Sequence, residues 1–158
     1  ETLDQINKIF AVNVSGVFNT IAPLQPRMIA RRAGHLAIMS SLASFHAFGG
    51  APAYCASKAA VRFYGEGLQE ALLPHGITVS VICPGFVDTP MTECNPFPMP
   101  LLMTAEKAVQ IIHAELQRRA KRIAFPFRIY IAVRALNLLP SWLIAHFTAD
   151  KKKPTSET

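Results

Sequence analysis

Two short apolar runs limit what this chain can fold into more than any other feature. Residues 35–41 read HLAIMSS and residues 77–83 read ITVSVIC. Short runs of this kind are typical of strands that are covered on both faces of a sheet. Between them lie a small-residue loop and a helical pattern over residues 53–73, which ends at a Pro-His-Gly turn. We therefore expect strands joined through a helix, the arrangement of a parallel α/β sheet.

Three further segments extend this pattern. Apolar residues recur at three- and four-residue steps from Leu3 to the region of Pro23 and Pro26, which predicts an amphipathic helix. A helix with a threonine N-cap is expected over residues 104–119, and residues 122–127 are a candidate third strand. The 158 residues suffice for one core. Two or three parallel strands alone would nevertheless leave edges and a whole sheet face uncovered.

The net charge of +6 comes from one end of the chain. Residues 1–114 contain seven basic and seven acidic side chains, whereas residues 115–158 contain nine and three, a difference of +6. The basic residues gather at the end of the predicted third helix and in a lysine run at 151–153. They indicate a favourable helix terminus and a solvated tail. Because no DNA- or RNA-binding motif accompanies them, we expect no nucleic-acid partner.

The three cysteines, Cys55, Cys83 and Cys94, form neither a C-x-x-C pair nor a spacing to histidine that would bind zinc. They cannot make a disulfide framework, so we expect a reducing compartment, a cytoplasmic protein and no metal site. The sequence opens on Glu1 and carries no basic-then-apolar leader. We therefore expect no signal peptide here and a native N-terminus that lies further upstream.

Four polar residues are candidate catalytic residues because of their positions on the predicted helices and strands. Tyr54 and Lys58 are four residues apart and share a helix face, and a phenol with a pKa of about 10 needs a neighbouring cation to exchange protons at neutral pH. Ser41 ends the first strand, where parallel sheets bind ligands. Asn13 lies on the apolar stripe of the first helix, where it would fix a kink or order water beside Lys58. The plain structural alternatives are a helix-surface pair, a loop-capping serine and a buried amide.

These residues belong to four motifs that occur in order between Ala11 and Met91. The motifs are Asn13-Val14-Ser15-Gly16, the serine Ser41 in MSSLAS, Tyr54-Cys55-Ala56-Ser57-Lys58 in AYCASKAAV, and Pro84-Gly85-Phe86-Val87-Asp88-Thr89-Pro90-Met91. In type, order and interval they resemble the short-chain dehydrogenase/reductase family, and they match its C-terminal, catalytic part.

The resemblance implies an NAD(P)-dependent oxidoreductase that interconverts a carbonyl and an alcohol by hydride transfer. Tyr54 would be the general acid/base, and Lys58 would lower its pKa and bind the nicotinamide ribose. Ser41 would hold the substrate oxygen, and Asn13 would support a water relay to the lysine. Tyr54, Lys58 and the residues after the second strand would contact the cofactor, the latter being Pro84, Gly85, Val87 and Thr89. The sequence does not distinguish NAD from NADP.

The family's phosphate-binding, Gly-rich turn has no counterpart here, since none of the eight glycines forms G-x-G-x-x-G at a strand-to-helix turn. We therefore expect an α/β fold that is a partial Rossmann-type doubly wound parallel sheet, lacking the N-terminal nucleotide-binding half. Residues 1–127 would form the catalytic half, and residues 128–158 an apolar helical extension with a basic tail. Alone, the chain should neither bind dinucleotide tightly nor turn over. Gly65 and Gly67 should let a neighbouring helix pack closely.

The candidate substrate contacts are Phe45, His46, Phe86 and Met91. They come from segments rich in Phe, Met and Leu, which favour a small apolar carbonyl or alcohol as substrate. The alternative is that these side chains only pack against one another.

The apolar segment 123–147 could contact a membrane or a second subunit. Its longest uncharged run, 135–149, has 15 residues, fewer than the ~20 of a spanning helix. Its apolar face would cover the substrate pocket, bury in a subunit interface, or rest on a membrane as a peripheral contact. We favour the first two, because family members commonly form homodimers or homotetramers through helices that correspond to 3–23 and 53–73. The competing hypothesis is a non-catalytic fragment or scaffold that keeps this helical interface, and a Gly-rich turn upstream would favour the enzyme.

Overall fold

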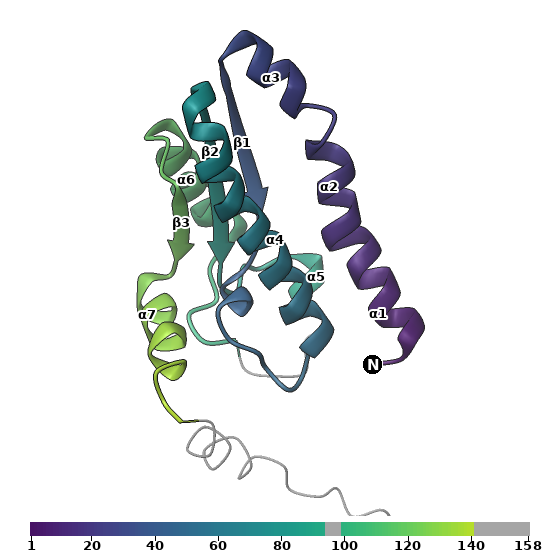
Figure 1. Cartoon of the computed structure of the whole chain (residues 1–158). Coiled ribbons are helices and arrows are strands. Elements are labelled where there is room, and N and C mark those ends of the chain that lie inside the picture. The colour runs from purple at the N-terminus through teal and green to yellow at the C-terminus, as the bar shows by residue number, and fades with distance from the viewer. Residues whose placement is uncertain (94–98, 141–158) are drawn as a thin grey trace, which may run out of the picture.

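The chain folds around three parallel strands (Figure 1). A computed structural model describes residues 1–93 and 99–140. The strands are β1 (Gly34–Met39), β2 (Ile77–Pro84) and β3 (Arg122–Phe125), and β2 lies between the other two. The register places Ile38 beside Val81. The α/β fold class and all three predicted strands are thereby confirmed.

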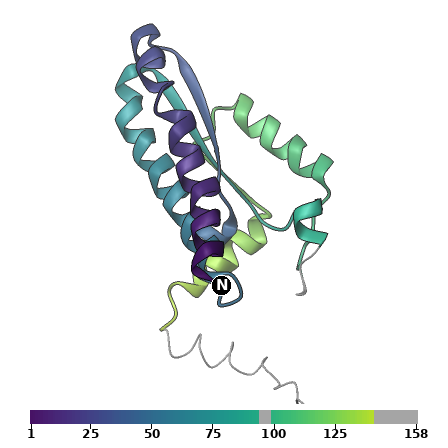
Figure 2. The same cartoon turned by 90° about the vertical axis from the view of Figure 1, so that its right-hand side faces the viewer.

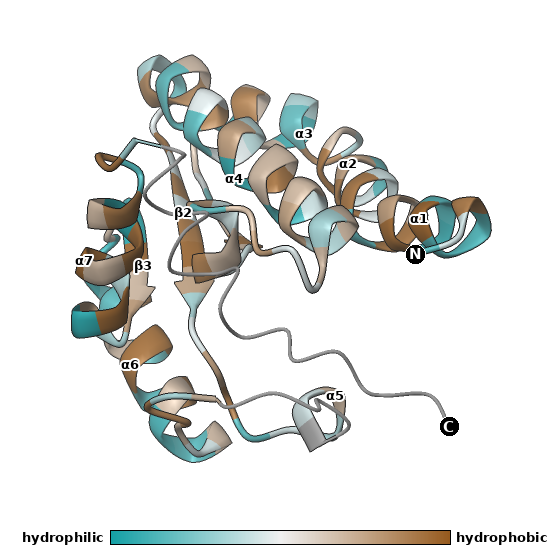
Figure 3. Cartoon of the chain, turned by 90° about the horizontal axis from the view of Figure 1, so that it is seen from below, coloured by the Kyte–Doolittle hydropathy of each residue, from teal (hydrophilic) through white to brown (hydrophobic). Residues whose placement is uncertain are grey.

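Helices lie on both sides of this sheet. The helices and helical turns are α1 (Leu3–Phe10), η1 (Ala11–Ser15), α2 (Gly16–Ile21), α3 (Gln25–Arg31), η2 (Leu42–Ser44), α4 (Pro52–Leu72), η3 (Leu73–His75), α5 (Pro90–Glu93), α6 (Ala105–Gln117) and α7 (Phe127–Leu136). In Figure 2 the strands pass between α1 and α4 on one side and α6 on the other. Figure 3 shows the same layers from the carboxyl ends of the strands, with the apolar β2 between them. The predicted cap of α6 is confirmed, since Thr104 accepts a hydrogen bond from the Lys107 amide.

Three apolar clusters hold the layers together. Between α4 and the sheet lie Ile38, Val61 and Val79 with their neighbours, and beneath α6 lie Ile82 and Ile123 with theirs. The third cluster consists of Leu42, Phe45, Val81, Cys83 and Val133, and it fixes α7 against the loop after β1. Each such side chain stabilises the fold by about 1.5–3 kcal/mol when it is fully buried.

The N-terminal helix departs from the prediction. Its apolar stripe is only half buried, because Leu3 and Phe18 are exposed and only Ile21 is fully covered. The predicted stop near the prolines is confirmed, because α2 ends at Ile21, but the sequence analysis missed the short helix α3, whose first turn contains Pro26. A proline is tolerated there because the first N–H groups of a helix have no intrahelical partner.

Strand β1 is the edge of the described sheet, and the prediction that both of its faces are covered is wrong. Leu36 and Ile38 are buried, whereas Ala37 is exposed and Met39 is 47% exposed. The central strand β2 meets the prediction, because its residues 79–83 are buried without alternation. The difference follows from position, since α6 covers the second face of the sheet at β2 and β3.

Helix α7 begins after Pro126 and is the first part of the predicted extension over residues 128–158. The rest of that extension, including the lysine run at 151–153, lies outside the described residues beyond residue 140. The predicted boundary between residues 127 and 128 stays a prediction. Within the described ranges, no helix is both long and apolar enough to cross a membrane.

Gly65 lies where α4 passes close to the sheet. A Cβ atom at this position would lie 2.6 Å from Val81 Cγ2 and 3.2 Å from Ile38 Cδ1. The glycine therefore makes room for the strands and not for a neighbouring helix, which corrects the prediction. Gly67 faces open space, because a Cβ atom there would meet no described atom within 4 Å, so close packing does not explain it.

We predict opposite effects for the two substitutions to alanine. Gly65→Ala should lower the free energy of unfolding by about 1–3 kcal/mol, because Val81 is fully buried and cannot give way. Gly67→Ala should raise it by about 0.5–1 kcal/mol through helix propensity alone. Chemical denaturation of both variants measures the difference, and equal midpoints would contradict the packing account.

Candidate active site

The candidate site lies at the carboxyl ends of β1 and β2, where a loop follows each strand. Ser40 continues the pairing of the strands, because its amide donates to the Ile82 carbonyl at 2.7 Å. The Ser41 hydroxyl accepts a hydrogen bond from the Ala43 amide at 3.1 Å and lies 3.4 Å from the Pro84 carbonyl oxygen. The chain then turns tightly through η2. This arrangement holds Ser41 at the junction of the two strand ends.

Helix α4 brings Tyr54 and Lys58 to the same place. The Ser40 hydroxyl donates to the Lys58 carbonyl at 2.8 Å, which ties the helix to the end of β1. The Lys58 ammonium donates to the Met39 carbonyl at 3.3 Å and lies 5.8 Å from the centre of the Tyr54 ring. The spacing of four residues therefore places both groups on the face of α4 that meets the strand ends.

Asn13 joins the first helix to α4. It lies in the π-helical turn η1, a local irregularity that often occurs at functional sites. Its side-chain amide donates to the Ser57 hydroxyl at 3.0 Å, and that hydroxyl donates to the Tyr54 carbonyl at 2.8 Å. These contacts tie the first helix to α4, and the predicted role of fixing a kink stays a prediction. The water-ordering role stays a prediction.

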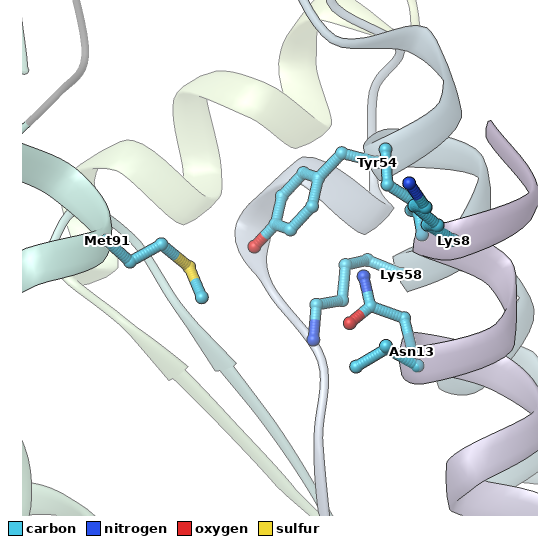
Figure 4. A pocket seen from close by; sticks show the side chains of 7 residues that line it. Lys8, Asn13, Tyr54, Lys58 and Met91 are labelled. Atoms are coloured by element: carbon cyan, nitrogen blue, oxygen red, sulfur yellow. The ribbon is translucent and has the colours of Figure 1, made fainter. Parts of the chain in front are cut away.

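A cavity of about 350 Å³ opens between these elements. Its lining residues are Lys8, Ile9, Val12, Asn13, Tyr54, Lys58 and Met91. In Figure 4 the tyrosine hydroxyl and the lysine ammonium lie on one side of this space, and the Met91 side chain faces them across it. Three of the four predicted catalytic residues thus share one cavity, together with one predicted substrate contact.

Burial controls the ionisation of both key groups. It raises the pKa of Tyr54 above its ordinary value, the Ser41 hydroxyl acts in the opposite direction, and Cys55 adds a smaller upward effect. Burial also lowers the pKa of Lys58, because removal from water disfavours the ammonium. The net pKa shift of Tyr54 is therefore opposite to the one that the resemblance implies. Lys58, 5.8 Å from the ring, does not outweigh the loss of hydration.

The other predicted substrate contacts lie elsewhere. Phe45 and His46 line a second cavity of about 250 Å³, on the side of α4 that carries Cys55. His46 Nδ1 lies 2.8 Å from Asn137 Oδ1, and the Asn137 amide donates to the Phe45 carbonyl. Sequence patterns gave no signal for Asn137, because its partners are more than ninety residues away in the chain. The structure brings Met91 to Tyr54 but places these two residues in a separate space.

The predicted cofactor contacts follow β2. Gly85 packs closely, since a Cβ atom there would lie 3.0 Å from Pro126 Cδ, and its amide donates to the Phe125 carbonyl at 2.7 Å. Val87 forms a bridge with Met103. The Thr89 amide donates to the Thr92 hydroxyl at 3.0 Å. Pro84 ends β2 and Phe86 is half-buried beside it, and the motif runs on to Pro90 and Met91 at the start of α5.

Two cysteines are buried free thiols, Cys55 and Cys83. Burial raises the pKa of Cys83 to about 11, which keeps the thiol protonated at neutral pH. Cys94 lies outside the described residues.

The sequence model of the family described as short chain dehydrogenase matches residues 1–96 of this chain. The chain belongs to the short-chain dehydrogenase family. The match spans all four motifs and therefore the whole cavity around Tyr54.

Comparison with known short-chain dehydrogenases and related oxidoreductases agrees with this membership. An uncharacterized oxidoreductase of Myxococcus xanthus is 36% identical over 138 residues, which are 87% of this chain and 54% of that protein. A short-chain dehydrogenase from Burkholderia cenocepacia, solved in complex with NADP, has a TM-score of 0.70 at 25% identity, over 90% of this chain and 57% of that one. A short-chain dehydrogenase from Sphingobium yanoikuyae in complex with NADPH has a TM-score of 0.76 at 21% identity, over 100% and 61%, and shows the shared fold. The chain spans about half the length of the curated relatives it matches.

The residues at the cavity fit the nicotinamide end of a dinucleotide. An ammonium carries three donors, and the one described hydrogen bond of Lys58 uses a single donor. Lys58 and Tyr54 can therefore present donors to ribose hydroxyls and to a substrate carbonyl from one face of the cavity.

The pKa of Tyr54 can be tested directly. The tyrosinate absorbance that wild-type protein has and Tyr54→Phe lacks should develop above pH 10, because burial makes the folded state hold this proton more tightly. The corresponding stabilisation is complete below about pH 10 and is lost as the pH rises through the raised pKa. Circular dichroism at each pH confirms that the protein is folded. If the tyrosinate absorbance of Tyr54 in the folded protein had its midpoint below pH 10, burial would not be the main influence on the pKa of Tyr54.

Proposed function

We propose that this chain is the catalytic part of an NAD(P)-dependent oxidoreductase that interconverts a carbonyl and an alcohol. The observation that carries the proposal is the shared cavity of Tyr54, Lys58 and Asn13 at the strand ends, with the Ser41 hydroxyl beside it. The family model and the related oxidoreductases support the reaction class. The NADP-bound and NADPH-bound structures support the cofactor class and leave NAD and NADP equally open.

In the direction of reduction, Tyr54 donates its hydroxyl proton to the substrate carbonyl oxygen as that oxygen becomes an alcohol. Tyr54 is protonated at neutral pH, as a general acid must be, and the nearby charge of Lys58 partly offsets the weaker acidity that burial causes. The Ser41 hydroxyl donates a hydrogen bond to the same oxygen and stabilises the negative charge that develops there. A bound nicotinamide supplies the hydride in this direction and accepts it in the other.

Lys58 binds the ribose hydroxyls and places a positive charge near the phenol. That charge favours the phenolate in the oxidation direction, when Tyr54 must take a proton from the alcohol. Asn13 holds η1 against α4 through Ser57 and so keeps the backbone of Tyr54 in register with the strand ends. Tyr54, which transfers the proton, and Lys58, whose charge stabilises the phenolate, therefore lie on the same face of α4.

The cavity suits an apolar substrate. Ile9, Val12 and Met91 contribute most of the non-ionic side chains around Tyr54, and apolar walls with a few polar groups are typical of small-molecule sites. We propose a small apolar ketone or alcohol as the substrate. Phe86, Phe45 and His46 stay predicted substrate contacts.

Tyr54→Phe should reduce the turnover number by at least about 10²-fold, because it removes the proton donor and leaves the ring in place. Binding of the dinucleotide should be retained, since Lys58 and the turn after β2 are unchanged. The assay follows the absorbance of NADH and NADPH with a panel of apolar ketones, using the protein at its natural length.

Tyr64→Phe is a matched control on the same helix. Its hydroxyl accepts a hydrogen bond from Gln25 at 3.2 Å and does not line the cavity. Turnover should stay within about twofold of wild type. If Tyr54→Phe kept full activity, Tyr54 would not be the general acid/base.

The scaffold hypothesis is less well supported, because the family and its related oxidoreductases favour an enzyme. We further propose that the 158-residue chain alone neither binds dinucleotide tightly nor turns over, and titration with NADPH tests this. The cytoplasmic location, the homodimeric or homotetrameric state and the peripheral membrane contact stay predictions.

A further inference from the structure

Arg62 is a buried cation one turn beyond Lys58 on α4, with only 9% of its surface exposed. Its guanidinium lies between the rings of Phe45 and Phe63, with the central carbon 4.4 Å from each ring centre. Nη1 donates to both carboxylate oxygens of Glu66, at 3.0 and 2.9 Å. Nη2 donates to the Ser44 carbonyl at 3.4 Å.

Stability of the fold does not by itself explain why an arginine occupies this buried position. Arg62 Nε is fully buried and has no hydrogen-bond partner among the described residues. A buried guanidinium loses its hydration, and an apolar side chain of similar length would pack between the two rings without that loss. What only the guanidinium provides is a directed contact from α4 to the loop after β1.

That loop is the turn that begins at Ser41. The Ser44 amide donates to the Ser41 carbonyl at 3.0 Å, and the Phe45 amide donates to the Leu42 carbonyl at 3.1 Å. Arg62 therefore holds the far end of the turn through the Ser44 carbonyl and the Phe45 ring. The near end of the same turn carries the Ser41 hydroxyl.

A second arginine supports Arg62 from β3. Arg122 Nη2 donates to Glu66 Oε1 at 2.8 Å, and its Nη1 donates to the Tyr130 hydroxyl at 3.2 Å. Glu66 is thus shared by two guanidinium groups, which fixes the carboxylate that orients Arg62. Helix α4, strand β3 and helix α7 all meet at this point.

We propose that Arg62 is a positioning residue that fixes the turn η2 and, through it, the direction of the Ser41 hydroxyl. The role rests on the proposed function, because it matters for turnover only if Ser41 binds the substrate oxygen. Arg62 touches neither substrate nor cofactor in this account. Its effect on the reaction passes entirely through Ser41.

A double-mutant cycle with Ser41→Ala tests this dependence. Arg62→Met should lower the turnover number about tenfold and leave the KM of the nucleotide within about twofold, because the nucleotide contacts are unchanged. In the Ser41→Ala background, Arg62→Met should cause no further loss. Arg62→Lys should restore little, since a lysine lacks the planar fork. The proposal would be overturned if the double variant lost the product of the two single-variant losses in turnover number. It would also be overturned if Arg62→Met alone left the turnover number unchanged.

Arg118→Met is the matched control, because Arg118 is an exposed arginine that pairs with Glu115 at 2.9 Å. It should leave turnover and the cycle unchanged. Hydrogen exchange supplies a readout that does not need activity. The amides of Ser44 and Phe45 should exchange at least about tenfold faster in Arg62→Met than in Arg118→Met, with the amides of β2 unchanged.

The two measurements separate the proposals. If the wild-type protein reduces no ketone with either nucleotide, the proposed function fails, and exchange at Ser44 and Phe45 still decides whether Arg62 orders the turn. If Arg62→Met does not fold, Arg62→Lys replaces it in both experiments. Exchange rates at these amides that match the control would overturn the positioning role.

Discussion

The parallel pairing of β1 with β2 is the interaction on which the rest of the structure depends. It brings the carboxyl ends of both strands to one edge, so that Ser41 lies 3.4 Å from the Pro84 carbonyl although 43 positions separate them. Helix α4 then crosses the pair at Gly65, where no side chain larger than hydrogen fits against Val81. The close approach sets the height of the helix over the sheet. It also determines where Tyr54 and Lys58 meet the strand ends.

Burial gives the site its chemical character. The same removal from water that stabilises the core raises the pKa of Tyr54 and lowers that of Lys58. Both shifts favour the neutral forms. A raised pKa keeps the phenol protonated at neutral pH but makes it a weaker proton donor, so the nearby ammonium of Lys58 favours proton transfer in both directions. The described residues therefore favour the protonated form of Tyr54. This preference weakens when Lys58 carries its charge and strengthens when Lys58 is neutral.

Much of the fold could be predicted from the sequence because its signals are local. The apolar runs at 35–41 and 77–83 and the N-cap Thr104 each act within a few residues, and the structure confirms them. The four motifs sufficed to predict the family. The cover of β1, in contrast, depends on which layers surround the strand, and Met39 shows that a strand can be apolar in sequence and exposed on one face.

Parts of the site could not be predicted for the same physical reason. Asn137 meets His46, and Arg122 meets Glu66, across 91 and 56 positions of the chain. No spacing rule links such pairs, because tertiary packing alone brings them together. Arg62 follows Lys58 by one helical turn, yet nothing in the pattern of α4 distinguishes it from a surface arginine. Only its burial between two aromatic rings does so.

The most direct test of the central claim is to follow deuterium from the nicotinamide C4 position to the product. The protein at its natural length is incubated with C4-deuterated NADH or NADPH and a panel of apolar ketones, and the alcohols are examined by mass spectrometry. A site built from Tyr54, Lys58 and Ser41 predicts one deuterium on the carbinol carbon, with the hydroxyl proton coming from the protein and solvent. Alcohol that carries only solvent hydrogen on that carbon, or no alcohol with either nucleotide, would contradict it.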